Sequence, residues 1–209
     1  MPAGRLITIE GLDGAGKSTL AQALAGELAA RALPVQLLRE PGGVELSERI
    51  RALLADPQLA VDARAEALLY AAARAQLVHE RVHPLLRDGA LVLLDRFIDS
   101  SLAYQGAGRE LGVEEVRALN GFATGGLQPD RTLLLTISPQ AGRARLRERA
   151  LEPDRLERER DEFFARIARA YAELARSEPA RIRSIDACQP PERVLADALV
   201  AIEDLVGAA

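Results

Sequence analysis

The sequence has a single cysteine, few aromatic residues, no long apolar run and no excess of positive charge. The one cysteine, Cys188, excludes an internal disulfide and favours a reducing compartment. No apolar stretch approaches the roughly 20 residues of a membrane span, and the apolar run at residues 6–9 is too short for the h-region of a signal peptide. The net charge of −4, from 27 Lys and Arg against 31 Asp and Glu, argues against a nonspecific nucleic-acid binder. We therefore expect a cytoplasmic protein that binds neither nucleic acid nor membranes.

The chain of 209 residues is long enough for one α/β domain with a sizeable core, and 48% of its residues are apolar. Short apolar segments predict strands at residues 5–10, 34–39, 90–95, 130–137 and 181–186. Longer amphipathic segments predict helices at residues 17–31, 45–55, 62–87 and 191–206, and another helix that begins at Pro139. Strands that are apolar on both faces and alternate with helices predict a five-stranded parallel sheet flanked by helices on both faces, in three layers.

A glycine-rich phosphate-binding motif follows the first predicted strand. Residues 11–19 fit the pattern of a P-loop, in which backbone N–H groups and a helix N-terminus surround phosphate oxygens; they are Gly11, Leu12, Asp13, Gly14, Ala15, Gly16, Lys17, Ser18 and Thr19. In such a motif we expect Lys17 to reach the β- and γ-phosphates and Ser18 to bind Mg²⁺. The motif therefore predicts a protein that binds ATP and magnesium.

The third predicted strand ends in Asp95, and Arg96 follows it directly. An aspartate at that strand end, beside the P-loop, can bind the magnesium ion, and the adjacent arginine can hold a second phosphate. The sequence has no Asn-Lys-x-Asp motif, which GTPases use to recognise guanine. A P-loop with an added arginine indicates two phosphorylated substrates that meet head to head, as in a nucleoside monophosphate kinase.

Several motifs in a fixed order make the chain similar to the bacterial thymidylate kinases over about residues 5 to 205. They are the P-loop, the Arg39-Glu40-Pro41-Gly42-Gly43 turn, Arg74, Asp95-Arg96-Phe97 and Ala103-Tyr104-Gln105-Gly106. The resemblance implies one P-loop kinase domain over residues 1–209 that transfers the γ-phosphoryl group of ATP to dTMP, giving dTDP and ADP. It also implies a homodimer. The alternatives are another nucleotide or deoxynucleotide kinase of the same fold, or a noncatalytic P-loop protein that binds ATP to regulate a partner.

The resemblance assigns the polar end of the acceptor nucleotide to four residues. It implies that Arg39 and Arg96 hold the monophosphate, that Asp13 accepts a hydrogen bond from a sugar hydroxyl, and that Tyr104 crowds the 2′ position and so favours deoxyribose. Because proline and two glycines fix the turn after Arg39, we expect its side chain at the carboxyl edge of the sheet, where open α/β sheets bind ligands.

The base is assigned to residues on two helices. Tyr70 and Arg74 are four residues apart and share a helix face, and the resemblance implies that Tyr70 stacks on thymine while Arg74 reaches its carbonyl edge. The family usually has phenylalanine where this chain has Tyr70, but tyrosine keeps the flat apolar face. Ser101 and Gln105, also four apart, can present hydrogen bonds to the same base. Taken alone, Tyr70 fits a core residue, and Ser101 with Gln105 a surface pair.

An arginine-rich stretch at about residues 143–157 is predicted to form a lid. Arginines alternate within it at Arg143, Arg145, Arg147 and Arg149. Some thymidylate kinases carry an arginine in the P-loop, whereas others have glycine there and place catalytic arginines in the lid; this chain has Gly14. We therefore predict that Arg149 of the lid is catalytic, together with Lys17 and Arg96. A solvated charged helix with intrahelical ion pairs is the alternative interpretation of the lid.

Overall fold

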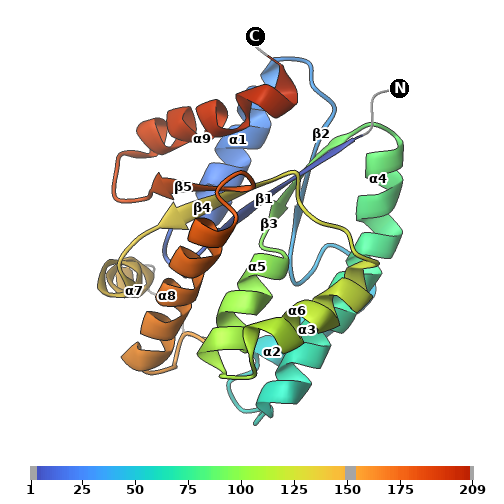
Figure 1. Ribbon diagram of the computed structural model, residues 1–209. Coiled ribbons are helices and arrows are strands. Elements are labelled where there is room, and N and C mark those ends of the chain that lie inside the picture. Colours follow the sequence, from blue (N-terminus) through green and yellow to red (C-terminus); the bar gives the residue numbers. More distant parts are fainter. Residues whose placement is uncertain (1–3, 149–153, 208–209) are drawn as a thin grey trace.

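All five predicted strands form one parallel sheet (Figure 1). The computed structural model describes residues 4–148 and 154–207. The strands lie in the order β2-β3-β1-β4-β5, and every neighbouring pair is parallel. Their bounds are β1 Arg5–Gly11, β2 Val35–Arg39, β3 Leu91–Asp95, β4 Arg131–Thr136 and β5 Ile182–Asp186. The predicted α/β fold is therefore confirmed.

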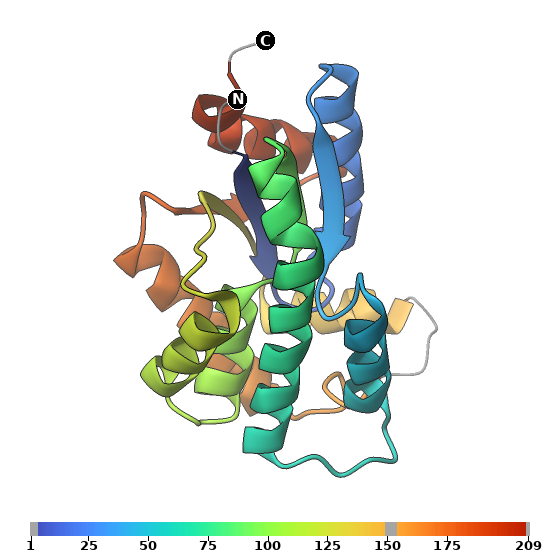
Figure 2. The same ribbon diagram turned by 90° about the vertical axis from the view of Figure 1, so that its right-hand side faces the viewer.

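The predicted helix at residues 62–87 is a continuous helical rod that runs along one side of the molecule (Figure 2). It consists of α3 (Ala63–Leu77), a π-helical turn η1 (Val78–Val82) and α4 (His83–Arg87). Asp62 is the N-cap, as predicted, because its side chain accepts hydrogen bonds from the N–H groups of Arg64 and Ala65. The π turn precedes Pro84, which has no N–H to continue the α-helical bonding pattern.

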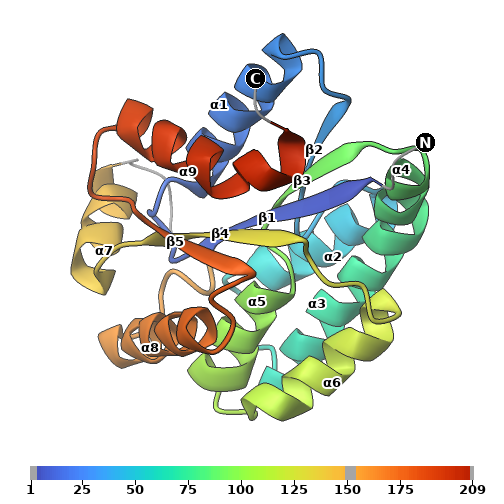
Figure 3. The same cartoon turned by 45° about the horizontal axis from the view of Figure 1, so that its top comes forward.

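Helices cover both faces of the sheet, which gives the three predicted layers (Figure 3). On one face lie α1 (Lys17–Ala30) and α9 (Pro191–Val206). There Ile7 of β1 packs in one buried cluster with Leu24 of α1 and Ile202 of α9. Leu6, the neighbour of Ile7, belongs instead to a cluster on the opposite face that includes Leu77 of α3. Because adjacent side chains of a strand point to opposite faces, the three inner strands β1, β3 and β4 are buried at consecutive positions, whereas the edge strands β2 and β5 are partly exposed.

The remaining helices lie on the side of the second face or near the ends of the strands. They are α2 (Glu45–Ala55), α5 (Ile98–Ser101), the π-helical η2 (Leu102–Gly108), α6 (Val113–Thr124), α7 (Pro139–Glu148) and α8 (Asp161–Ser177). The predicted helix start at Pro139 is confirmed. Two of these helices, α6 and α8, are not among the predicted elements. No helix in residues 4–148 or 154–207 has the length and apolar character to cross a membrane.

Parallel pairing brings the ends of three strands together at one edge of the sheet. In the register of β2 and β3, Arg39 lies beside Asp95, and in that of β1 and β3, Ile9 lies beside Asp95. The P-loop that follows β1 therefore starts next to the turn after β2 and next to Arg96 after β3. The predicted phosphate-binding residues meet at this edge because the sheet is parallel.

Candidate active site

The P-loop connects β1 to α1 in a conformation that requires glycine. Gly14 has a φ angle of 81° and Gly16, the N-cap of α1, has a φ angle of 93°, both in the region that side chains disfavour. The first N–H groups of α1 have no partner within the helix and carry its positive dipole end. The loop and helix together form the kind of site that binds phosphate.

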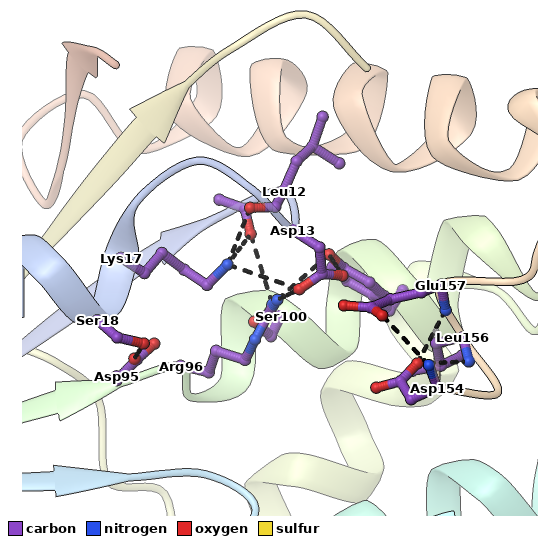
Figure 4. Close-up of polar contacts among 12 residues, drawn as sticks. Leu12, Asp13, Lys17, Ser18, Asp95, Arg96, Ser100, Asp154, Leu156 and Glu157 are labelled. Carbon is purple, nitrogen blue, oxygen red and sulfur yellow. Dashed lines mark hydrogen bonds and ion pairs between the residues drawn. The ribbon is translucent and has the colours of Figure 1, made fainter. Parts of the chain in front are cut away.

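Lys17 lies in the first turn of α1 and is buried against the P-loop (Figure 4). Its Nζ donates to the carbonyl oxygens of Gly11, at 3.1 Å, and Leu12, at 2.9 Å. Burial is the largest cause that lowers the pKa of the Lys17 ammonium to about 8, and the charge of Arg96 acts in the same direction, against the opposing charge of Asp13. Lys17 is therefore a buried cation that pairs with Asp13 Oδ1 at 3.8 Å and lies beside a loop suited to bind anions.

The two predicted metal ligands are in contact. Ser18 Oγ donates to Asp95 Oδ2 over 2.6 Å, which joins the start of α1 to the end of β3 (Figure 4). Within residues 4–148 and 154–207, no three His, Cys, Asp or Glu side chains gather as a metal site would require. A hydroxyl and one carboxylate fit Mg²⁺ that takes its other ligands from phosphate and water. They do not fit a metal held by protein ligands alone.

Arg96 joins the P-loop to η2. Its guanidinium forms an ion pair with Asp13 in the P-loop, donates to Ser100 Oγ at 3.0 Å, and lies over the Tyr104 ring at 5.0 Å from the centroid. Tyr104 completes the triangle, since its hydroxyl donates to Asp13 Oδ2 at 2.8 Å. Burial of Asp13 opposes its ionisation, but the charges of Arg96 and Lys17 outweigh it and lower its pKa to about 2.

A buried carboxylate that we did not predict forms hydrogen bonds that hold this cluster in place. Glu10, at the end of β1, accepts hydrogen bonds from the N–H of Phe97 at 2.8 Å and from Ser100 Oγ at 2.5 Å. It also accepts one from the Tyr171 hydroxyl at 3.1 Å. These bonds fix the turn in which Arg96 has a φ angle of 69°, an uncommon value for a residue with a side chain. Burial is the largest cause that raises the pKa of Glu10 to about 7, and the nearby Asp99 adds to it.

One cavity of about 290 Å³ connects the P-loop to the predicted base-binding residues. The predicted site residues that line it are Asp13, Gly14, Gly16, Lys17, Ser18, Arg39, Tyr70, Arg74, Asp95, Arg96, Ser101, Tyr104 and Gln105. Residues from five parts of the chain thus face a common space. Ser101 and Gln105 both reach it, although the helix between them changes from α5 to the wider π-helical winding of η2.

Arg74 is placed at this cavity but is bound tightly to the protein. Its side chain is 2% exposed. Nε donates to Glu40 Oε2 at 2.7 Å, Nη2 donates to the carbonyl oxygen of Phe97 at 2.9 Å, and Nη1 donates to Ser101 Oγ at 2.9 Å and to Asn120. All three nitrogens are engaged, so any contact of Arg74 with a base is shared with these partners.

Two exposed arginines face the phosphate end of the cavity. Arg39 pairs with Glu48 at 2.8 Å, and Arg51 donates to the carbonyl oxygen of Pro41 at 3.0 Å. Both line the cavity. Arg51 is not among the predicted site residues. The sequence did not distinguish it, because it is one of several arginines on an amphipathic helix.

The described arginines of the predicted lid that lie on α7 face the protein or the solvent. Arg143 pairs with Asp161 and lies over the Phe164 ring, Arg145 donates to the carbonyl oxygen of Ala187 at 2.9 Å, and Arg147 is exposed. Arg149, the predicted catalytic lid residue, lies outside the described residues. The start of α7 instead approaches the P-loop through Gly142, whose carbonyl oxygen would lie 2.2 Å from a Cβ atom on Gly14.

Glu66 is a third residue of the site, besides Glu10 and Arg51, that the sequence analysis did not predict. It is fully buried in the first turn of α3 and accepts a hydrogen bond from Gln105 Nε2 at 2.9 Å. A signal for it was present, because Glu66, Tyr70 and Arg74 succeed one another at intervals of four on one helix face.

The sequence is similar to known thymidylate kinases over nearly its whole length. The thymidylate kinase family matches residues 9–198. A thymidylate kinase of Oenococcus oeni is 47% identical over 211 residues, covering 98% of this chain and 97% of its own, and one of Bacillus velezensis is 43% identical, covering 96% of each. The crystal structure of thymidylate kinase from Ehrlichia chaffeensis superposes with a TM-score of 0.79 at 28% identity, over 97% of this chain and 99% of that one. The chain therefore belongs to the thymidylate kinase family and is a dTMP kinase, an enzyme of the nucleoside monophosphate kinase class.

Proposed function

We propose that this chain transfers the γ-phosphoryl group of ATP to the 5′-phosphate of dTMP through the residues that line the cavity beside the P-loop. The observation that carries the proposal is the continuity of that cavity, which runs from Lys17 and Ser18 of the P-loop to Tyr70 and Arg74. A donor on the P-loop and an acceptor beside Tyr70 would meet at Arg96. Holding two reactants in line in this way is the main source of catalysis in phosphoryl transfer.

The donor side consists of the P-loop and two oxygen ligands. ATP phosphates bind the backbone N–H groups of residues 11–19, and Lys17 turns from its carbonyl partners to the β- and γ-phosphates. Ser18 and Asp95, whose oxygens are 2.6 Å apart, would hold Mg²⁺. That ion supplies charge neutralisation on the phosphates when it is bound.

On the acceptor side, different residues hold the phosphate, the sugar and the base of dTMP. Arg39, Arg51 and Arg96 provide positive charge for the 5′-phosphate of dTMP, with Arg51 added because it lines the same cavity. Asp13 and Tyr104, which are hydrogen bonded to each other, face the sugar.

The base is held farther along the cavity by Tyr70, Arg74, Ser101 and Gln105. The ring of Tyr70 offers a flat apolar surface for the pyrimidine, and burial raises the pKa of its hydroxyl above the usual range, so it stays neutral. The side chains of Ser101 and Gln105 supply polar atoms at the edge of the base.

An oxygen of the dTMP phosphate attacks the γ-phosphorus, and the bond from that phosphorus to the bridging oxygen of ADP breaks. The attacking oxygen is already ionised, so the reaction needs no strong general base. Lys17 and Arg96 stabilise the charge that is spread over the transferred group. We propose that the segment at about residues 143–157 acts as the lid of this single kinase domain and that Arg149 adds a third positive charge.

Coupled ADP release, measured with dTMP, dUMP, dCMP, dGMP and AMP in turn, tests the proposal. We expect turnover to be fastest with dTMP. A preference for another monophosphate would favour the related nucleotide kinases, and ATP binding without turnover of any acceptor would favour a noncatalytic regulator.

We further propose a homodimer that works in the cytoplasm. Helices α2, α3 and α6 pack side by side and turn one face outward (Figure 2). These three helices carry exposed apolar side chains, which are Phe122, at 91% exposed, and Leu46, Leu53 and Leu68. Large exposed apolar side chains on neighbouring helices support a subunit interface. Light scattering should give twice the chain mass for the wild type and a smaller mass for Phe122→Glu.

A further inference from the structure

The carboxylate of Glu66 is a meeting point of three elements at the base end of the cavity. Glu66 is fully buried and belongs to α3. Arg109, at the end of η2, donates to it from Nε and Nη2 at 3.2 Å and 3.0 Å, and Gln105 donates at 2.9 Å. A second arginine, Arg155, places Nη1 at 2.7 Å from Glu66 Oε2. Arg155 comes from the segment of residues 154–160 that leads into α8.

Arg155 ties this segment to two walls of the cavity. Besides its ion pair with Glu66 of α3, its Nε donates to the carbonyl oxygen of Leu54, near the end of α2, at 3.1 Å. Leu54 lines the cavity, and so do Asp154 and Leu156, the two neighbours of Arg155 in the chain. One guanidinium therefore holds the segment across the same space that Tyr70 faces.

The segment forms a compact turn of its own. The N–H groups of Leu156 and Glu157 both donate to Asp154 Oδ1 at 2.9 Å (Figure 4). These bonds link Asp154 to the backbone of residues 156 and 157, so the contacts of Arg155 help to position all three cavity-lining residues.

The two arginines at Glu66 differ in what their loss would do. Arg109, at the end of η2, covers the Phe163 ring at 4.8 Å and also pairs with Glu159 of the 154–160 segment, so it holds the far end of that segment. Arg155 is the residue that ties the part of the segment lining the cavity. If Arg155 were lost, Glu66 would keep Arg109 and Gln105 as partners, so no buried charge would be left uncompensated.

We propose that Arg155 is a positioning residue for the acceptor nucleotide: its contacts with Glu66 and Leu54 hold residues 154–157 over the bound base and slow its departure. This inference rests on the proposed binding of the base beside Tyr70. It predicts that Arg155 affects the dissociation of dTMP more than the binding of ATP, because its partner Glu66 also binds Gln105, one of the residues proposed to hold the base.

The test compares Arg155→Ala with Arg155→Lys and with Arg160→Ala, which removes an exposed arginine of the same segment. Stopped-flow fluorescence with a fluorescent dTMP analogue, together with steady-state kinetics, gives the dissociation rate and the separate KM values for dTMP and ATP. We expect Arg155→Ala to raise the dissociation rate and the KM for dTMP about tenfold, with the KM for ATP changed less than about twofold. Arg155→Lys should be intermediate, because an ammonium can pair with Glu66 but cannot also reach Leu54 with a second nitrogen.

Each result decides the matter. Thermal melting should show Arg155→Ala folded, since Glu66 keeps Arg109, and if it is not, Arg155→Lys carries the comparison. Three results would overturn the role of Arg155 while leaving the proposed function intact. They are an unchanged dissociation rate of dTMP in a folded variant, an equal effect of Arg160→Ala, and an equal weakening of ATP and dTMP binding. A wild-type chain that does not bind dTMP would instead overturn the proposed function, and the role of Arg155 with it.

Discussion

ATP binding should weaken as the pH rises above about 8, because Lys17 then loses its charge. Burial against the P-loop is the main reason that the pKa of Lys17 is lowered to about 8, and the charge of Arg96 adds to it. In the free enzyme the ammonium donates to the carbonyl oxygens of Gly11 and Leu12 and pairs with Asp13 Oδ1 at 3.8 Å. Bound phosphates would place several negative charges beside Lys17, which raises its pKa again. The protonated form of Lys17 is therefore the form that binds ATP.

The size of the effect follows from the fraction of Lys17 that is protonated. At about one pH unit above its pKa, roughly one free molecule in ten carries the ammonium, so the dissociation constant for ATP should rise about tenfold between pH 7 and pH 9. This corresponds to about 1.4 kcal/mol of binding free energy. The slope approaches a factor of ten per pH unit above pH 8 until the pKa of the complex is reached.

Isothermal calorimetry of ATP at pH 7, 8 and 9, with circular dichroism to show that the fold persists, measures this dependence. Lys17→Arg is the matched control, since a guanidinium stays charged throughout the range. It is expected to bind ATP more weakly at every pH but with little change between pH 7 and pH 9. An ATP affinity of the wild type that is constant from pH 7 to 9, or an equal slope in Lys17→Arg, would refute the reasoning.

Three further predictions concern the residues around the P-loop. Arg96→Ala should lose dTMP turnover far more than ATP affinity, because the side chain lies between the P-loop and η2; calorimetry with each nucleotide would contradict this if both affinities fell equally. Gly14→Arg should destabilise the fold by about 1–3 kcal/mol, since its Cβ would lie 2.2 Å from the Gly142 carbonyl oxygen, and an unchanged melting temperature would count against it. Burial raises the pKa of Glu10 from its usual 4.5 to about 7, so its contribution to stability is present below pH 4.5 and is lost as the pH rises through 7. Urea unfolding of the wild type should therefore show a loss of stability across this range that Glu10→Gln lacks, and parallel curves would disprove it.

Much of the fold was predictable because it depends on local patterns. A strand buried on both faces of a parallel sheet needs a mostly apolar sequence, as in β1, β3 and β4, and all five predicted segments are strands. Asp62 identified a helix start because capping is a bond between near neighbours. Helix α8 was predictable in principle, since Phe163, Phe164, Ile167 and Tyr171 recur at helical spacing, but the charges between them obscured the pattern.

The candidate site was predictable where one short motif carries the geometry. The P-loop fixes Lys17 and Ser18 within a few residues, and the ends of parallel strands must lie at one edge, which brought Arg39, Asp95 and Arg96 to it. For these residues the sequence by itself determined both the chemistry and the place.

Only the tertiary structure decided which charged side chains bind one another across the chain. Arg155 pairs with Glu66, which is 89 positions earlier in the chain. Arg74 donates to Glu40, Ser101 and the backbone of Phe97, and Glu10 accepts hydrogen bonds from the turn after β3. An arginine on a helix looks the same in sequence whether it faces solvent, a ligand or a buried carboxylate. The partner of an arginine depends on how deeply its charge is buried and on which opposite charge lies near it. Both are set only when the helices and strands pack together.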